Sequence, residues 1–145
     1  MKFKEYLIEN KEKNIDIYFD MDGVFAEYDI GNFDYSSIRP IKSVIKLMEK
    51  LSKEKINVKV LSICKNNKIV NEKYGWINKY ASFLKKDNIN FISKEENPGF
   101  ESSELKSNFL RKNINILIDD DIVIIKKVIK ENEEVKVFHV SSIIE

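Results

Sequence analysis

The sequence contains little cysteine, proline, glycine or histidine: its 145 residues include one cysteine, two prolines, four glycines and one histidine. Because Cys64 is the only cysteine, no disulfide can form within the chain, and a reducing, cytoplasmic location is expected. The first five residues lack the apolar core of a signal peptide, and no apolar run approaches membrane-spanning length. We therefore expect no membrane partner.

An excess of charge of either sign is also missing. Lysine and arginine total 25, aspartate and glutamate 24, so the net charge is only +1. Nucleic acid is therefore not expected as a partner, and any recognition of phosphate must be local. Hydrophobic residues make up 43% of the chain and charged residues 34%, as is typical of globular proteins. The length predicts one domain, residues 1–145, with its own core, but says nothing of oligomeric state.

Two carboxylates separated by one residue directly follow an apolar stretch near the N-terminus. Residues 15–19 are mostly apolar and lead into Asp20-Met21-Asp22-Gly23-Val24. A buried pair of like charges is costly unless something compensates it, and a divalent cation would do so. A second acidic cluster, Asp119-Asp120-Asp121, follows the apolar residues 114–118. Two strand ends that carry paired acids predict one Mg²⁺ site assembled from distant parts of the chain.

Strand-like and helix-like patterns alternate along the chain. We expect strands at residues 14–20, 56–62, 88–93, 114–118 and 135–140. Helices are expected after Pro40, at residues 69–86, around residues 105–110 and at residues 121–132. This alternation predicts an α/β fold: a three-layer, Rossmann-like parallel sheet of about five strands with helices on both faces and no large cap domain.

Two segments lie outside that alternation. Residues 1–13 are expected to form an N-terminal helical extension, and residues 24–38 an active-site loop. In parallel sheets of this kind, ligands bind beyond the carboxyl ends of the strands. Asp20, Ser62 and Asp119 all fall at such predicted ends, so we expect them to belong to one site.

These segments together resemble the four motifs of the haloacid dehalogenase-like superfamily of phosphatases. The resemblance is carried by Asp20-Met21-Asp22-Gly23-Val24 after a strand, Ser62 at the end of a second strand, Lys106 ahead of a helix, and Asp119-Asp120 at the end of a later strand. Within the superfamily the chain is most similar to the 5'(3')-deoxyribonucleotidase family and its small bacterial and phage relatives. The supporting segments are Arg39-Pro40-Ile41, Glu72-Lys73-Tyr74-Gly75-Trp76 and Lys106-Ser107.

The resemblance implies a Mg²⁺-dependent phosphomonoester hydrolase. Asp20 would attack phosphorus and form an aspartyl-phosphate, and Asp22 would act as general acid and then base, with its pKa raised relative to that of Asp20. The metal would be held by Asp20, by the backbone carbonyl of Asp22, and by Asp119 or Asp120, of which Asp120 is favoured. The phosphate would be bound by Ser62, by the neighbouring Ile63 and by Lys106.

Structural interpretations of the same residues remain open. Asp119 and Asp120 could merely cap the helix that follows them, and serines such as Ser62 end many strands. Lys94 is the next candidate after Lys106 for the phosphate-binding lysine. Structural roles are expected for Asp121 at the helix start, Cys64, His139 and Trp76.

The spacing of the motifs leaves no room for a large cap, so the site should be open to a small phosphorylated substrate. Aromatic rings of the loop 24–38, among them Phe25 and Tyr28, could stack on a nucleobase or could simply anchor the loop. Nucleoside monophosphates are the leading expectation, and the resemblance points to the deoxy series. The alternatives are sugar phosphates, phosphorylated ends of larger molecules, and a receiver-like or degenerate phosphate-binding domain without activity.

Overall fold

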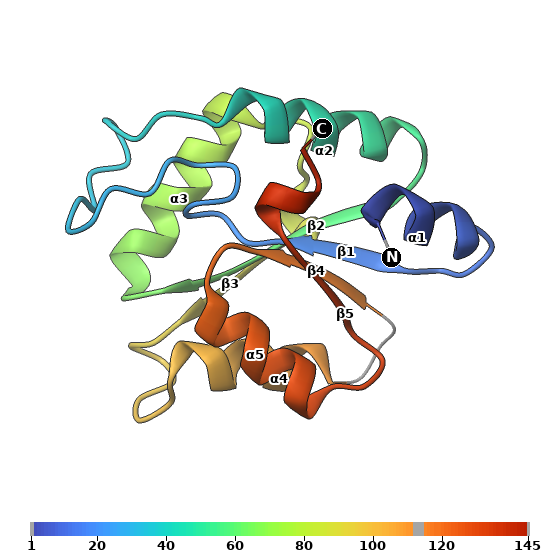
Figure 1. The fold of residues 1–145 in the computed structure, drawn as a ribbon. Coiled ribbons are helices and arrows are strands. Elements are labelled where there is room, and N and C mark those ends of the chain that lie inside the picture. The colour runs from blue at the N-terminus through green and yellow to red at the C-terminus, as the bar shows by residue number, and fades with distance from the viewer. Residues whose placement is uncertain (1, 112–114, 145) are drawn as a thin grey trace.

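A computed structural model describes residues 2–111 and 115–144 of the chain. Five parallel strands form one sheet in the order β3-β2-β1-β4-β5 (Figure 1). The strands are β1 (Asp16–Phe19), β2 (Asn57–Cys64), β3 (Ile89–Ser93), β4 (Asn115–Asp119) and β5 (Lys136–His139). The chain leaves the central β1 toward β3 and then returns to the other side of β1 at β4. The strand order therefore reverses between β1 and β4, where folds of this type bind ligands.

Helices cover both faces of the sheet. The helices α1 (Phe3–Glu9), α2 (Lys42–Lys53) and α3 (Asn67–Tyr80) lie on one face, and α4 (Ser102–Leu110) and α5 (Ile122–Glu131) lie on the other (Figure 1). Two short 3-10 helices, η1 (Lys86–Asn88) and η2 (Val140–Ser142), complete the elements. This is the predicted three-layer α/β fold, and the residues that the structure describes form no large cap.

The central strand β1 packs against both layers because its side chains alternate between the two faces of the sheet. Ile17 and Phe19 are fully buried in the larger core, beneath α1, α2 and α3. Tyr18 belongs to the smaller core under α4 and α5, together with Leu117 and Val128. A strand that is buried on both faces reads as an almost continuous apolar run, which is why its sequence signal was strong.

The register of the sheet brings the strand ends together. Phe19 pairs with Val60 of β2 and with Ile118 of β4. The next residue, Asp20, donates its backbone N–H to the carbonyl of Ile118 over 2.9 Å and thus lies level with Asp119. The expectation that the two acidic clusters meet at one edge of the sheet is confirmed.

Several element boundaries differ from the predicted ones. β2 continues two residues past Ser62, to Cys64, because it pairs with β3 over its last five residues. α3 starts at Asn67, where the side chain of Asn66 caps it, and ends at Tyr80 rather than at residue 86. Pro40 is not in the first turn of α2. It forms an isolated antiparallel bridge with Ala26 and so ties the loop 24–38 to the start of the helix.

At the N-terminus, the predicted extension at residues 1–13 is helical only from Phe3 to Glu9. Met1 and Ile114, the first residues of the predicted extension and of the predicted fourth strand, lie outside the described residues. No described helix has the length and apolar character needed to cross a membrane.

Candidate active site

A buried lysine joins the two acidic strand ends. Lys106, on α4, places its Nζ 2.9 Å from Oδ1 of Asp20 and 2.6 Å from Oδ2 of Asp119. The other oxygen of Asp119 accepts the backbone N–H groups of Asp120 and Asp121, at 2.8 and 3.0 Å. Both oxygens of Asp119 are therefore engaged, and its carboxylate holds Lys106 and the start of the following turn in place. Lys106, rather than Lys94, is the lysine that meets these carboxylates.

Burial changes the acid–base properties of this cluster. Loss of solvent raises the pKa of Asp20 to about 7, and the charge of Asp119 adds to the increase while Lys106 opposes it. Burial alone would lower the pKa of Lys106, but the charges of Asp20 and Asp119 outweigh it and raise that pKa above its usual value. The pKa of Asp120 is also raised, by burial and then by the charge of Asp119. The cluster thus holds more negative charge than its lysine offsets.

Three of the four predicted metal-binding residues could hold one cation together. Asp20, Asp119 and Asp120 each offer a carboxylate oxygen, and these oxygens lie within 4.8 Å of one another. Carboxylate oxygens are hard ligands of the kind that Mg²⁺ prefers, and three acids that share one lysine leave an excess charge that a divalent cation would offset. Because Asp119 already has partners on both oxygens, Asp120 is the better placed of the two to reach a cation. The side chain of Asp22 faces elsewhere.

The glycine of the first motif makes room for Asp120. Gly23 has a φ of +82°, and a Cβ added there would collide with the Asp120 carboxylate. We expect Gly23→Ala to displace that carboxylate and to weaken Mg²⁺ binding by about tenfold or more, since one metal ligand is lost, and to cost about 1–3 kcal/mol of backbone strain. Calorimetric Mg²⁺ titration and urea unfolding measure the two effects.

Gly99 provides the matched control for that substitution. Its φ is +84°, but a Cβ there would meet nothing within 4 Å. Gly99→Ala should therefore carry a similar backbone cost without changing Mg²⁺ affinity. Equal Mg²⁺ affinities for the two variants would contradict the placement of Asp120 in the metal site.

A second buried lysine organises the other half of the candidate site. Lys73, on α3, places its Nζ 2.8 Å from Oδ2 of Asp22 and donates to the hydroxyl of Ser62 over 2.8 Å. The hydroxyl of Tyr35, from the loop 24–38, donates to Oδ1 of Asp22 over 2.8 Å. The carbonyl of Ile63 lies 3.5 Å from the same lysine nitrogen. Asp22, Ser62 and Ile63 are thus brought to one place, next to Asp20.

The environment of Asp22 differs from the predicted one. The sequence analysis expected the raised pKa at Asp22, but the structure raises it at Asp20, which is almost fully buried. Asp22 lies between the Lys73 ammonium and the Tyr35 hydroxyl. Burial and the neighbouring Asp22 raise the pKa of Tyr35, so its hydroxyl stays protonated and acts as a donor.

Sequence reasoning did not assign Lys73 to the site, and it gave Tyr35 only as one of the loop rings that could stack on a nucleobase, not as a partner of Asp22. Lys73 was noticed only as part of the segment from Glu72 to Trp76. A signal for it exists: it shares the buried face of α3 with Ile69, Trp76 and Ile77, and a lysine in an apolar helical stripe needs a buried partner. No comparable pattern marks Tyr35.

The loop 24–38 divides its aromatic rings between the core and the surface. Phe25 has no exposed surface and packs against Trp76, with ring centroids 6.0 Å apart, so the expectation that it contacts substrate is wrong. It lies in the core because the loop folds back onto α2 and α3. Tyr28 and Phe33 are 64% and 51% exposed, and the Lys65 ammonium lies over the Phe33 ring, 5.4 Å from its centroid.

The remaining predicted structural roles agree with the geometry. Asp121 caps α5, accepting the N–H of Val123 over 2.9 Å. The indole nitrogen of Trp76 donates to the carbonyl of Ile38 over 2.9 Å. Cys64 is buried, and burial raises the pKa of its thiol. His139 ends β5, lies opposite Asp119 in the register of the sheet, and its ring contacts the hydroxyl of Ser141.

Solved structures of low sequence identity share this fold. A chain of the Pnkp1/Rnl/Hen1 RNA repair complex matches with a TM-score of 0.65 at 13% identity, over 87% of this chain and 42% of its own. The N-terminal part of BF1531 from Bacteroides fragilis contains a phosphatase domain complexed with Mg, and it matches with a TM-score of 0.58 at 18% identity, over 93% of this chain and 39% of its own. The D,D-heptose 1,7-bisphosphate phosphatase from Burkholderia thailandensis matches with a TM-score of 0.52 at 12% identity, over 87% of this chain and 92% of its own.

Identities this low show a common fold and no more. The present chain spans less than half of the length of the first two of these proteins. No protein-family model and no curated protein sequence matches the chain.

Proposed function

We propose that this chain is a Mg²⁺-dependent phosphomonoester hydrolase of the haloacid dehalogenase-like superfamily, acting through an aspartyl-phosphate at Asp20. The observation that carries the proposal is the meeting of Asp20, Lys106, Asp119 and Asp120 at the carboxyl edge of the sheet, beside Ser62 and Lys73. Phosphatase domains with the same fold support it.

Asp20 would provide the attacking oxygen. Its carboxylate is fixed by Lys106, which Asp119 in turn holds, so one oxygen is positioned for in-line attack on phosphorus. The P–O bond to the leaving group breaks as the bond from Asp20 to phosphorus forms, and water then releases phosphate from Asp20. Mg²⁺ bound by Asp20, Asp120 and the backbone carbonyl of Asp22 would supply charge that offsets the repulsion between carboxylate and phosphate.

Ser62 and Lys73 would bind the phosphoryl oxygens. Their polar atoms lie 2.8 Å apart, and Lys73 is fixed by contacts to Asp22 and Ser62. A buried ammonium beside a hydroxyl presents the positive charge and the hydrogen-bond donors that a phosphate dianion needs. Lys106, which contacts Asp20, would contribute further positive charge.

Asp22 would pass a proton to the leaving oxygen and later take one from water. We expect Asp22→Asn to slow the hydrolysis of alkyl phosphates by about 10²-fold or more, and that of an aryl phosphate with a good leaving group much less, because the good leaving group needs little protonation. Comparing kcat across a series of leaving groups measures this. A uniform loss across the series would remove the acid role from Asp22.

Magnesium affinity should depend on pH through Asp20. Because the pKa of Asp20 is raised to about 7, its carboxyl is neutral below that pH, and cation binding must displace the proton. We expect the apparent Kd for Mg²⁺ to weaken by about tenfold for each pH unit below 7 and to level off above it. Calorimetry in buffers of different ionisation enthalpy also counts the released protons, and an affinity independent of pH between about 5.5 and 7 would contradict this.

Nucleoside monophosphates are the substrates that the open site supports best. The exposed Tyr28 and Phe33 rings lie on the loop whose Tyr35 contacts Asp22, so a base could stack near the reacting phosphate. Phosphorylated ends of larger molecules are the second candidate, favoured by the absence of a cap and by the shared fold with a chain of an RNA repair complex.

A substrate panel separates these candidates. Phosphate release with Mg²⁺ should give the highest kcat/KM for nucleoside monophosphates, and replacing Tyr28 by alanine should raise KM for nucleotides while leaving a small aryl phosphate unaffected. Preference for 3'- or 5'-phosphorylated oligonucleotides over mononucleotides would favour the second candidate. No phosphate release from any member would contradict the proposed hydrolase.

A further inference from the structure

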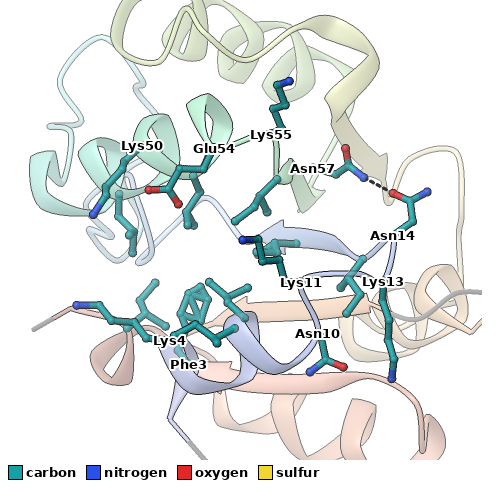
Figure 2. Close-up of a pocket in the computed structure, with 18 residues that line it drawn as sticks. Phe3, Lys4, Asn10, Lys11, Lys13, Asn14, Lys50, Glu54, Lys55 and Asn57 are labelled. Carbon is teal, nitrogen blue, oxygen red and sulfur yellow. Dashed lines mark hydrogen bonds between the residues drawn. The ribbon is translucent and has the colours of Figure 1, made fainter.

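An apolar groove with a basic mouth lies at the edge of the sheet opposite the candidate active site. It has a volume of about 770 Å³ and runs between α1 and α2, over the start of β1 and β2 (Figure 2). The acidic cluster lies at the other, carboxyl ends of these parallel strands. Its apolar lining comes from helix, strand and C-terminal residues, among them Phe3, Leu7, Ile15, Leu47, Leu51 and Ile143.

The groove is not closed over by the described chain. Ile8, which lines it, is 74% exposed, although an isoleucine on the inner side of a helix is normally covered. A cleft of this volume falls within the range of roughly 300–1,000 Å³ that is usual for small-molecule sites. Filling an apolar cleft with an apolar ligand removes its lining from water, which is favourable in free energy.

The charged groups of the groove are almost all of one sign. Its lining includes five lysines and a single acid, Glu54. Lys11 lies between the two walls, Lys50 reaches down from α2 toward one end of the groove, and the amines of Lys13 and Lys55 point away from it (Figure 2). Among the described residues no ion pair is found for Lys11 or Lys50, both of which are exposed. In this view the Glu54 carboxylate lies between the two amines, so one acid accompanies the two lysines that face the groove (Figure 2).

We propose that this groove binds an anionic single-chain amphiphile, with its carboxylate between Lys11 and Lys50 and its alkyl chain along the apolar lining. The lysine stems are apolar and extend the lining toward the mouth, while their ammonium groups stay at the surface to meet the head group. A neutral or cationic amphiphile would fill the same volume without that contact. Charge complementarity therefore selects the anion, since lysines outnumber acids in the lining five to one.

The test uses decanoate, below the concentration at which it forms micelles, as probe. In ¹H–¹⁵N spectra of the full chain it should shift amides of residues 3–15 and 47–57 and leave those of residues 20–24 and 117–121 unchanged. Decanol and decyltrimethylammonium, which lack the negative charge, should bind the natural protein at least about fivefold more weakly than decanoate. Decanoate should bind the Lys11→Glu/Lys50→Glu double variant more weakly by the same factor, since both exposed charge contacts are lost. The matched Lys13→Glu/Lys55→Glu variant has the same net charge and should keep the affinity within about twofold.

A further variant tests the contact between the alkyl chain and the apolar lining of the groove. Ile8→Ser alters an exposed side chain and should leave the fold intact while weakening decanoate by about threefold. The proposal is overturned if decanoate and decanol bind with equal affinity, or if the two lysine double variants weaken decanoate binding equally. It is also overturned if decanoate shifts only amides of other residues. An acidic amphipathic helical peptide that shifts the same amides when decanoate does not would also overturn it, and would assign the groove to a protein partner.

Discussion

Asp20→Asn is expected to abolish phosphatase activity while leaving the protein folded. The amide cannot attack phosphorus, so kcat for an aryl phosphate in the presence of Mg²⁺ should fall by about 10³-fold or more. The substitution removes a carboxylate that is nearly fully buried, and Lys106 keeps its 2.6 Å contact with Asp119. The fold should therefore tolerate the change, and urea unfolding should show little loss of stability.

The matched control is Asp121→Asn, an identical chemical change at the residue after Asp120, whose side chain caps α5 instead of facing Lys106. Asp121 caps α5 through the N–H of Val123, and its loss should cost about 1 kcal/mol or less, since asparagine also caps helices. Its kcat should stay within about twofold of the natural value. Full turnover by Asp20→Asn, or equal losses in the two variants, would remove Asp20 as the nucleophile.

Lys106→Met is expected to have the largest effect on stability. Its ammonium lies between two buried carboxylates, so removing it leaves both without their cation. Taking one partner from a buried ion pair costs about 3–5 kcal/mol, which is a large fraction of the stability of a domain of this size. Urea unfolding without metal measures the loss, and kcat should fall with it because Asp20 is no longer held.

Magnesium and a second substitution separate the electrostatic cause from poor packing. Saturating Mg²⁺ should stabilise Lys106→Met more than the natural protein, because the cation offsets part of the carboxylate charge that has lost its lysine. Adding Asp119→Asn to Lys106→Met should recover about 1–2 kcal/mol, since one uncompensated buried charge is removed. If neither Mg²⁺ nor the second substitution recovers stability, the loss comes from packing and the electrostatic role of Lys106 is wrong.

The fold was predictable from the sequence because each strand has a strong local signal. The apolar run before Asp20 and the one before Asp119 both belong to strands buried on two faces, which admit few polar residues. Parallel strands then place the residues that follow them at one edge, so the meeting of Asp20 with Asp119 and Asp120 followed from the topology. The ends of α3 and β2 were less predictable, since tertiary pairing rather than local sequence sets them.

The details of the candidate site depend on side chains whose partners are distant in the chain. Lys73 and Asp22 are separated by 51 positions, and Tyr35 reaches Asp22 from a loop without regular structure. The wrong expectation for Phe25 and the unforeseen contact between Lys73 and Asp22 share this origin. Whether a ring lies in the core or a carboxylate meets a cation is decided by packing between elements, which local patterns do not encode.

The stereochemical course at phosphorus tests the covalent mechanism most directly. Attack by Asp20 followed by attack of water is two in-line displacements, each of which inverts the phosphorus centre. A phosphate ester made chiral by oxygen isotopes and sulfur, turned over by the natural enzyme with Mg²⁺, should therefore yield product with net retention of configuration. Net inversion would show a single direct attack by water and would contradict an aspartyl-phosphate at Asp20.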